Sequence, residues 1–262
     1  LGVRVIWSFY LIVLFLLSSG NATAGQLAER LANFPQWEKI QSVSPAMGDL
    51  VYPDWMEGNW QVKSTLIDLV APLAPNIVTP GFEGNRQYLN QPTDFQIRFV
   101  QEKKLFSSLK FIPHTDSKSK VVADRAFNSL NLARAYLNDS TVLSVKVDPK
   151  SPNRQITFLR GDRRLISIVT KRSTETTYDD KFIATEAFQQ LFKGGGRPYF
   201  NFVESTTAYH QLQTSSPGVE ATQVTAVYLS PQDPDYFAAG SRPVALYRYR
   251  LEFFPLHFSS GN

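Results

Sequence analysis

The chain has 262 residues, a net charge of +4 and no cysteine. This charge is too small to indicate a nucleic-acid-binding protein, and the lack of cysteine excludes disulfides, thiolate catalysis and cysteine-based zinc sites. Hydrophobic residues make up 43% and aromatic residues 13%, which favours a β protein with a sizeable core over a charged helical bundle or a disordered chain.

The first 24 residues have the pattern of a secretory signal. Arg4 precedes an apolar run over residues 5–17, and residues 22–24 (Ala-Thr-Ala) supply an A-x-A cleavage site. We therefore expect an exported protein whose residues 1–24 are removed after Ala24. An uncleaved membrane anchor is the alternative, because residues on both sides of the run extend it to the length of a tilted span.

Residues 25–50 are expected to be an N-terminal extension of the folded domain. Residues 26–31 favour a short helix, which Pro35 ends. We expect Phe34 and Trp37 to pack on the domain that follows, and contact with a partner is the less favoured interpretation.

Short alternating segments from residue 51 to residue 256 predict a single β domain. Trp60, Val62, Ser64 and Leu66 share one parity and have polar neighbours, which is typical of a strand buried on one face. Further strands are expected at residues 95–99, 105–112, 141–148, 155–160, 164–172, 181–192, 199–213, 222–230 and 243–254.

One helix interrupts these strands. Asp124 can cap it, and Ala126, Leu130, Ala133 and Leu137 recur at helical spacing. The remaining strands follow one another without helices, which predicts an antiparallel meander. Closing this sheet into a barrel of about 8–10 strands would remove its exposed edges.

The segment from Tyr52 to Trp60 resembles the start of the lipocalin barrel, where a Gly-x-Trp opens the first strand. Gly58 and Trp60 take those positions. The resemblance implies a mainly β, antiparallel, lipocalin-like barrel in which an arginine of the last strand lies across the indole. Arg248 and Arg250 have the same parity, and we favour Arg250 for this barrel-closing contact.

The same segment and the Pro-Val-Ala-Leu-Tyr-Arg-Tyr-Arg run that ends at Arg250 are together similar to a family of exported lipocalin-like proteins of cyanobacteria and plastids. This resemblance implies a location in the periplasm or thylakoid lumen, and it implies no particular activity.

Aromatic and charged residues with inward parity are the candidate ligand-binding residues. A carboxylate inside a barrel must be paired or protonated, so Glu186 and Glu204 would anchor a ligand or form structural ion pairs with Arg98, Arg125 or Arg160. The aromatic side chains would line a cavity or fill the core. The full candidate set is Trp60, Phe95, Arg98, Phe99, Phe158, Glu186, Phe200, Phe202, Glu204, Tyr209, Tyr228 and Tyr247.

Three functions are compatible with these patterns. The favoured one is a monomeric carrier of a hydrophobic small molecule of the lipid or pigment class. The second is a non-enzymatic assembly factor that contacts membrane complexes through residues 25–53 and a basic hairpin over residues 160–172. The third is a pigment-modifying enzyme using Glu186, Glu204 and Tyr209. We predict no catalytic motif, cofactor or metal site, because His114, His210 and His257 lack ligand spacing.

Overall fold

The computed structural model describes residues 25–40, 43–77, 81–102, 119–137, 139–194, 196, 198–214 and 216–256. The predicted signal segment and the strand expected at residues 105–112 lie outside these ranges. The helices are α2 (Gln26–Ala32), α3 (Arg125–Leu137) and α4 (Tyr236–Ala239), with 3-10 helices η1 (Asp54–Met56) and η2 (Glu83–Tyr88). The strands are β1 (Ser44–Pro45), β2 (Val51–Tyr52), β3 (Gly58–Val70), β4 (Pro92–Gln101), β5 (Val121–Ala123), β6 (Val142–Asp148), β7 (Ser151–Leu159), β8 (Arg163–Thr176), β9 (Phe182–Lys193), β10 (Tyr199–Gln211), β11 (Val219–Tyr228) and β12 (Ala245–Pro255).

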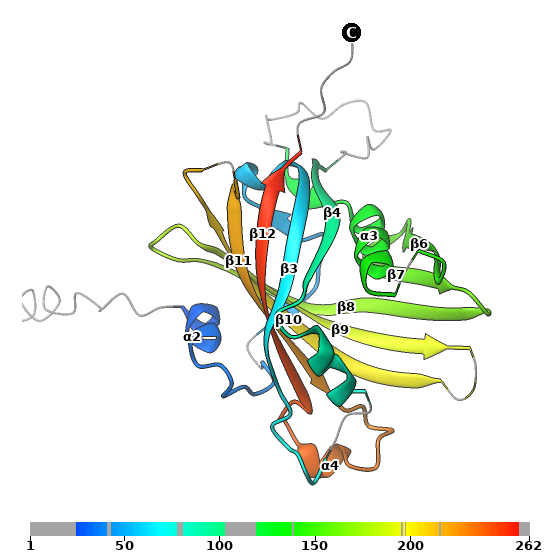
Figure 1. Cartoon of the computed structure of the whole chain (residues 1–262). Helices are drawn as coiled ribbons and strands as arrows, with labels where there is room; N and C mark the ends of the chain where they lie inside the picture. The colour runs from blue at the N-terminus through cyan, green and yellow to red at the C-terminus, as the bar shows by residue number, and fades with distance from the viewer. Residues whose placement is uncertain are drawn as a thin grey trace, which may run out of the picture.

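All the named strands belong to one antiparallel sheet. Its order is β2-β5-β4-β3-β12-β11-β10-β9-β8-β7-β6, and β1 pairs separately with β8 (Figure 1). The predicted meander is confirmed, since β6 to β12 are consecutive neighbours. The last strand, β12, pairs with β3, the first long strand, so the two ends of the domain meet inside the sheet.

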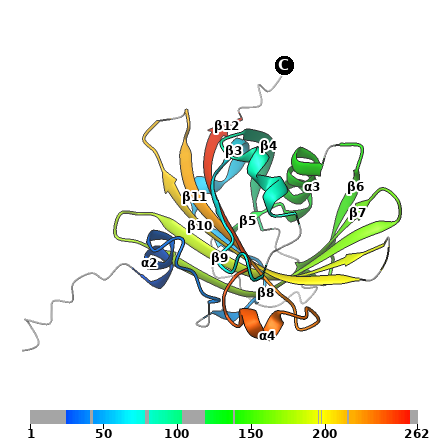
Figure 2. The ribbon, with the colours of Figure 1, turned by 60° about the horizontal axis from the view of Figure 1, so that its bottom comes forward.

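The sheet curls into a half-barrel. β3, β11 and β12 rise on one side of the trough and β6 and β7 on the other, with α3 in the opening between them (Figure 2). No ladder among the described strands joins β6 to β2 or β5. The expected continuous closure of the barrel is therefore not seen in this part of the chain, where α3 contacts β4 on one side of the opening and β6 on the other.

The two faces of the sheet are covered by different elements. We call the face carrying Val62, Tyr209 and Leu251 the inner face, and the face carrying Glu204, Thr222 and Leu246 the outer face. Residues paired across an antiparallel ladder point to the same face of the sheet. The register of the ladders therefore shows which residues of each strand lie on the inner face and which on the outer face. Bulges at Thr170 of β8 and at Ile67 of β3 bend the strands and increase the local twist.

The N-terminal extension covers the outer face. Leu27 and Leu31 of α2, together with Trp37 and Ile40, pack on outer-face residues of β9, β11 and β12. The expected packing of Trp37 on the domain is thus confirmed. Glu175 of β8 accepts hydrogen bonds from the Leu27 and Ala28 amides at 2.9 and 3.4 Å and so caps α2.

α3 begins where the sequence predicts. The carboxylate of Asp124 accepts a hydrogen bond from the Phe127 amide at 3.0 Å, which is the geometry of an N-cap. The side-chain amide of Asn128 bonds both the N–H and the C=O of Arg98, at 2.8 and 3.0 Å, and so docks the helix on β4. Within the described ranges, no helix has both the length and the apolar character needed to cross a bilayer.

Candidate functional site

A cavity of about 360 Å³ lies inside the half-barrel, between the inner face of the sheet and α3. We call it the interior cavity. Its lining has five aromatic rings among mostly aliphatic and hydroxyl side chains, and none of the lining residues is charged. They are Val62, Ser64, Phe95, Ile97, Asn128, Ser129, Leu132, Tyr136, Tyr209, Gln223, Thr225, Tyr249, Leu251 and Phe253.

Strand alternation accounts for most of this lining. Val62 and Ser64 of β3 have the inward parity predicted from the sequence, and both are at most 3% exposed. In β4, Phe95 and Ile97 lie opposite Val62 and Trp60, so they also point inward. Alternate residues of β10, β11 and β12 complete the wall.

The polar groups of the interior cavity are neutral hydrogen-bonding groups. The hydroxyls of Ser64 and Tyr136 lie 3.1 Å apart, and the Gln223 amide donates to the Thr225 hydroxyl at 3.2 Å. Burial, together with the neighbouring phenols of Tyr136 and Tyr247, raises the pKa of Tyr249 well above its ordinary value. The phenol of Tyr249 is therefore uncharged at neutral pH.

An ion-pair network lies on the same inner face. Glu186 of β9 accepts hydrogen bonds from Arg125 of α3 at 2.9 Å and from Arg172 of β8 at 2.6 Å. Arg125 also contacts Asp49 at 2.8 Å, and Arg172 bonds the side chain of Asn153 at 2.8 Å. The network ties the start of α3 to three strands, β7, β8 and β9, and to the loop before β2.

Electrostatics keep this network ionised. Burial by itself raises the pKa of Glu186, but the two guanidinium groups outweigh burial, so the pKa of Glu186 lies below its ordinary value. The same carboxylate helps to raise the pKa of Arg125, against the opposing effect of burial. Glu186 is consequently a fixed anion, poorly suited to exchange protons near neutral pH.

A cluster of four rings lies next to the network. Tyr52 contacts Phe99, Phe182 and Tyr209, with ring centroids 4.6, 5.8 and 6.0 Å apart. Tyr209 extends this cluster to the wall of the interior cavity. Burial raises the pKa of Tyr209 to about 12, so this ring also presents an uncharged hydroxyl.

A family model described as "Domain of unknown function (DUF6816)" matches residues 44–257. The chain belongs to this family. The DUF6816 region begins at β1 and contains all the strands, the interior cavity and the Glu186 network, whereas α2 precedes it. Neither the curated proteins nor the solved structures searched gave a match.

The DUF6816 sheet brings together part of the predicted ligand-binding set. Phe95 and Tyr209 line the interior cavity, and Trp60 and Phe99 pack in the same core cluster. Tyr247 also faces inward, but its ring lies against Phe82 toward the other end of β12. Arg98 lies outside the cavity, where it pairs with Asp124 at 2.7 Å.

Glu204 corrects the sequence-based assignment. It lies on the outer face, 2% exposed, and pairs with Arg30 of the N-terminal extension. The Ile40 amide and the Tyr228 hydroxyl also donate to it, each at 3.3 Å. The alternation of β10 correctly placed Glu204 on the same face as Phe200 and Phe202. Because other elements cover both faces of this sheet, the apolar character of that face did not indicate which face is the interior.

The same reason moves four predicted aromatic residues out of the interior. Phe202 and Tyr228 pack with the N-terminal extension on the outer face. Phe200 shares their parity on β10. Phe158 lies on the outer side of β7, where Lys146 and Arg164 approach its ring at 5.6 and 5.8 Å.

Neither predicted barrel-closing arginine lies on Trp60. In the β3–β12 register Trp60 is opposite Pro255, whereas Arg250 is opposite Thr65, about 16 Å further along the strand. Both arginines are on the outer face, and Arg248 approaches the ring of Phe34 instead. Trp60 donates to the Met56 carbonyl at 2.9 Å and lies edge-on to Phe253.

The sequence analysis missed the contribution of α3 to the site. The helix was predicted from the helical spacing of Ala126, Leu130, Ala133 and Leu137, of which Leu137 is 48% exposed. The cavity instead receives Ser129, Leu132 and Tyr136, together with Asn128. Their spacing of three and four residues was the available signal, but two polar residues in this stripe obscured it.

Proposed function

We propose that the half-barrel binds a neutral, mainly apolar small molecule of the lipid or pigment class in its interior cavity. The observation that carries this proposal is the cavity itself, about 360 Å³ with aromatic walls and no charged lining residue. Ligand sites of this kind are typically concave, mostly apolar and furnished with a few polar groups.

The polar groups restrict the ligand further. Hydroxyls of Ser64, Tyr136 and Thr225 and the amide of Gln223 can donate to or accept from a hydroxyl or carbonyl group. A charged ligand would lose its hydration without meeting an opposite charge, which is unfavourable. We therefore favour an alcohol, ketone or ester on a long apolar body.

The exposed side chains of α3 support this interpretation. Leu132 and Tyr136 line the cavity but are still 42% and 46% exposed. A ligand in the cavity would cover these surfaces and gain about 25 cal/mol per Å² of apolar area removed from water. The lipocalin resemblance suggests the same site, since that fold also holds its ligands inside a barrel.

Two threonines of β11 provide a matched pair of variants. Thr225 points into the interior cavity, whereas Thr222, three residues away, points from the outer face. We expect Thr225→Trp to weaken binding of a fluorescent long-chain polyene alcohol at least tenfold, because the indole occupies the ligand's space. Thr222→Trp should change this affinity by less than twofold, with both affinities measured by fluorescence titration.

Mass spectrometry of solvent extracts from the purified protein adds a second readout. A co-purifying apolar compound should be present in the Thr222→Trp variant and depleted in Thr225→Trp. Near-ultraviolet circular dichroism checks that both variants keep the native fold. Equal binding by the two folded variants, or no binding by the native protein, would contradict the interior site.

We further propose that the chain is exported to a periplasmic or lumenal compartment, as its first 24 residues suggest. Cleavage after Ala24 would leave Gly25 as the first residue, beside the Glu175 carboxylate that caps α2. Mass analysis of the protein from the exported fraction should find this N-terminus, and an intact residue 1–24 segment would contradict cleavage.

A further inference from the structure

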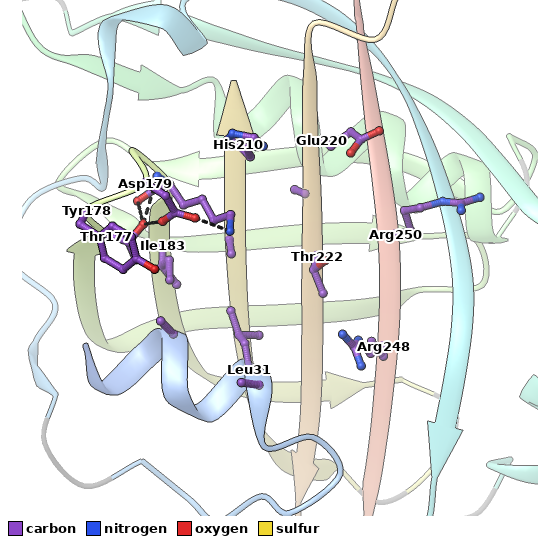
Figure 3. Close-up of a pocket in the computed structure, with 15 residues that line it drawn as sticks. Leu31, Thr177, Tyr178, Asp179, Ile183, His210, Glu220, Thr222, Arg248 and Arg250 are labelled. Carbon is purple, nitrogen blue, oxygen red and sulfur yellow. Dashed lines mark hydrogen bonds and ion pairs between the residues drawn. The ribbon is translucent and has the colours of Figure 1, made fainter. Parts of the chain in front are cut away.

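A second cavity, of about 480 Å³, opens on the outer face of the sheet. We call it the outer cavity. Its floor is formed by β10, β11 and β12, and α2 and the turn at residues 177–181 form two of its sides (Figure 3). It exists because the N-terminal extension covers only part of the outer face, leaving a recess where α2 ends.

Among the cations that line the outer cavity, one has no counter-ion in the described part of the chain. Lys181 pairs with Asp179 at 2.6 Å, and Arg250 approaches Glu252 at 4.0 Å. Arg248 forms no ion pair with any described residue, although Asp68 lies opposite it on β3. Its Nε is buried and has no hydrogen-bond partner in the described part of the chain.

The position of Arg248 suits a ligand better than that of Arg250. Arg248 lies on the side of β12 that faces β11 and α2, whereas Arg250 extends across β12 toward β3 (Figure 3). The Arg248 guanidinium is 5.4 Å from the ring of Phe34, which restrains it from one side. Arg248 lines the outer cavity, so an anion entering it would supply the counter-charge that this guanidinium lacks among the described residues.

The rest of the recess combines an apolar wall with a polar rim. Leu31 of α2, Ile183 of β9 and Ala208 of β10 line the wall. The two carboxylates, Asp179 and Glu220, lie at the rim; Asp179 is held by Lys181, and Glu220 is exposed to solvent. The recess therefore offers one positively charged anchor beside an apolar surface.

We propose that the outer cavity binds an organic anion, with a carboxylate or phosphate head on Arg248 and an apolar body against α2. This site is independent of the interior cavity, because the two lie on opposite faces of the sheet. The anion is either a free amphiphile or the headgroup of a membrane lipid, and these two sources share the same chemistry.

Titration of the full chain with monomeric octyl phosphate tests the proposal, by calorimetry and by the NMR signals of arginine Nε–H groups. We expect saturable binding and a shift of the Arg248 Nε–H resonance. Arg248→Gln should weaken binding at least tenfold. Arg164→Gln, which removes the same charge from an exposed ion pair at the β7–β8 turn, should weaken it less than twofold.

The paired tryptophan variants locate the site. Thr222→Trp fills the outer cavity and should abolish octyl phosphate binding, whereas Thr225→Trp should leave it unchanged. Arg248→Lys keeps the charge but loses the Nε–H, so we expect an intermediate loss. This pattern would hold even if the interior cavity proved empty, so failure of one proposal is distinguishable from failure of the other.

Separate arms identify the source of the anion. Sedimentation with phosphatidylcholine vesicles containing phosphatidic acid reports on a lipid headgroup, and octyl phosphate reports on a free amphiphile. Binding in either arm that Arg248→Gln removes supports the site. Equal binding of inorganic phosphate, equal losses in Arg248→Gln and Arg164→Gln, or no binding in either arm would overturn it.

Discussion

Glu186 and Glu204 lie on neighbouring strands, one register step apart, and face opposite sides of the sheet. Each pairs with an arginine from a covering helix, Glu186 with Arg125 of α3 and Glu204 with Arg30 of α2. At the scale of single residues these two carboxylates therefore fix the helices to the two faces. Both ion pairs are shielded from solvent, so their loss leaves an uncompensated charge.

Glu186→Gln should lower the free energy of unfolding by about 3 kcal/mol at pH 7, because two buried guanidinium groups lose their anion. The pKa of Glu186 is depressed in the folded state, so its contribution is present above the ordinary carboxyl range and is lost as pH falls. The difference between the native protein and Glu186→Gln should thus be full above about pH 5 and shrink below about pH 4.

Urea unfolding from pH 3 to pH 8 measures this difference. Glu83→Gln is the control, since Glu83 pairs with Arg86 in an exposed ion pair. It should leave stability at pH 7 unchanged within error. A Glu186→Gln effect that is constant over the whole pH range would contradict an ionised network.

At the scale of elements, α3 occupies the opening of the half-barrel and is the least buried part of the site. No described residue of α3 is fully buried. Its attachment depends on the Asp124 cap, the Asn128 bonds to β4 and the Arg125 ion pairs. A helix attached mainly by such polar contacts can separate from the sheet locally, which would admit a ligand to the interior cavity.

Asp124→Ala should lower the free energy of unfolding by about 1–2 kcal/mol, because the cap is lost together with the partner of Arg98. Asp124→Asn should have a smaller effect, since asparagine also accepts from the Phe127 amide. Urea unfolding of both variants separates the cap from the ion pair. Equal losses in the two variants would show that the charge on Asp124, not the cap, stabilises α3.

At the scale of the whole molecule, the central strands of the half-barrel are better protected than the strands at its edges. β10 and β11 each have a neighbour on both sides, and the N-terminal extension covers part of their outer face. β6 and β2 are the edges of the described sheet. The curled sheet therefore has a centre that is paired on both sides and an open seam, and β10 and β11 of the centre contribute to the lining of both cavities.

Hydrogen exchange should show this difference directly. We expect peptides from β10 and β11 to exchange slowest and those from β6 to exchange fastest among the long strands, because β6 is paired on one side only. Mass spectrometry of peptides after pulse labelling measures the order. Protection of β6 equal to that of β10 would mean that its free edge is covered, as in a closed barrel.

The local sequence pattern was sufficient to predict most helices and strands, but it was not sufficient to predict which residues line the site. The alternation of Trp60, Val62, Ser64 and Leu66 predicted β3 and its buried face, and Asp124 predicted the start of α3. The short strands β1, β2 and β5 were missed, because two or three residues carry no readable period. The barrel-closing contact predicted for Arg250, or for Arg248, was wrong, because a shared parity says nothing about position along the strand.

The sequence by itself determined most of the long strands and, between bulges, which residues of a strand share a face, since these depend on the two-residue period of a β-strand. Only the tertiary structure decided which face is the interior. The N-terminal extension buries Glu204 on the outer face, and α3 and the curl of the sheet bury Glu186 on the inner face, so the two residues look alike in sequence but lie on opposite sides.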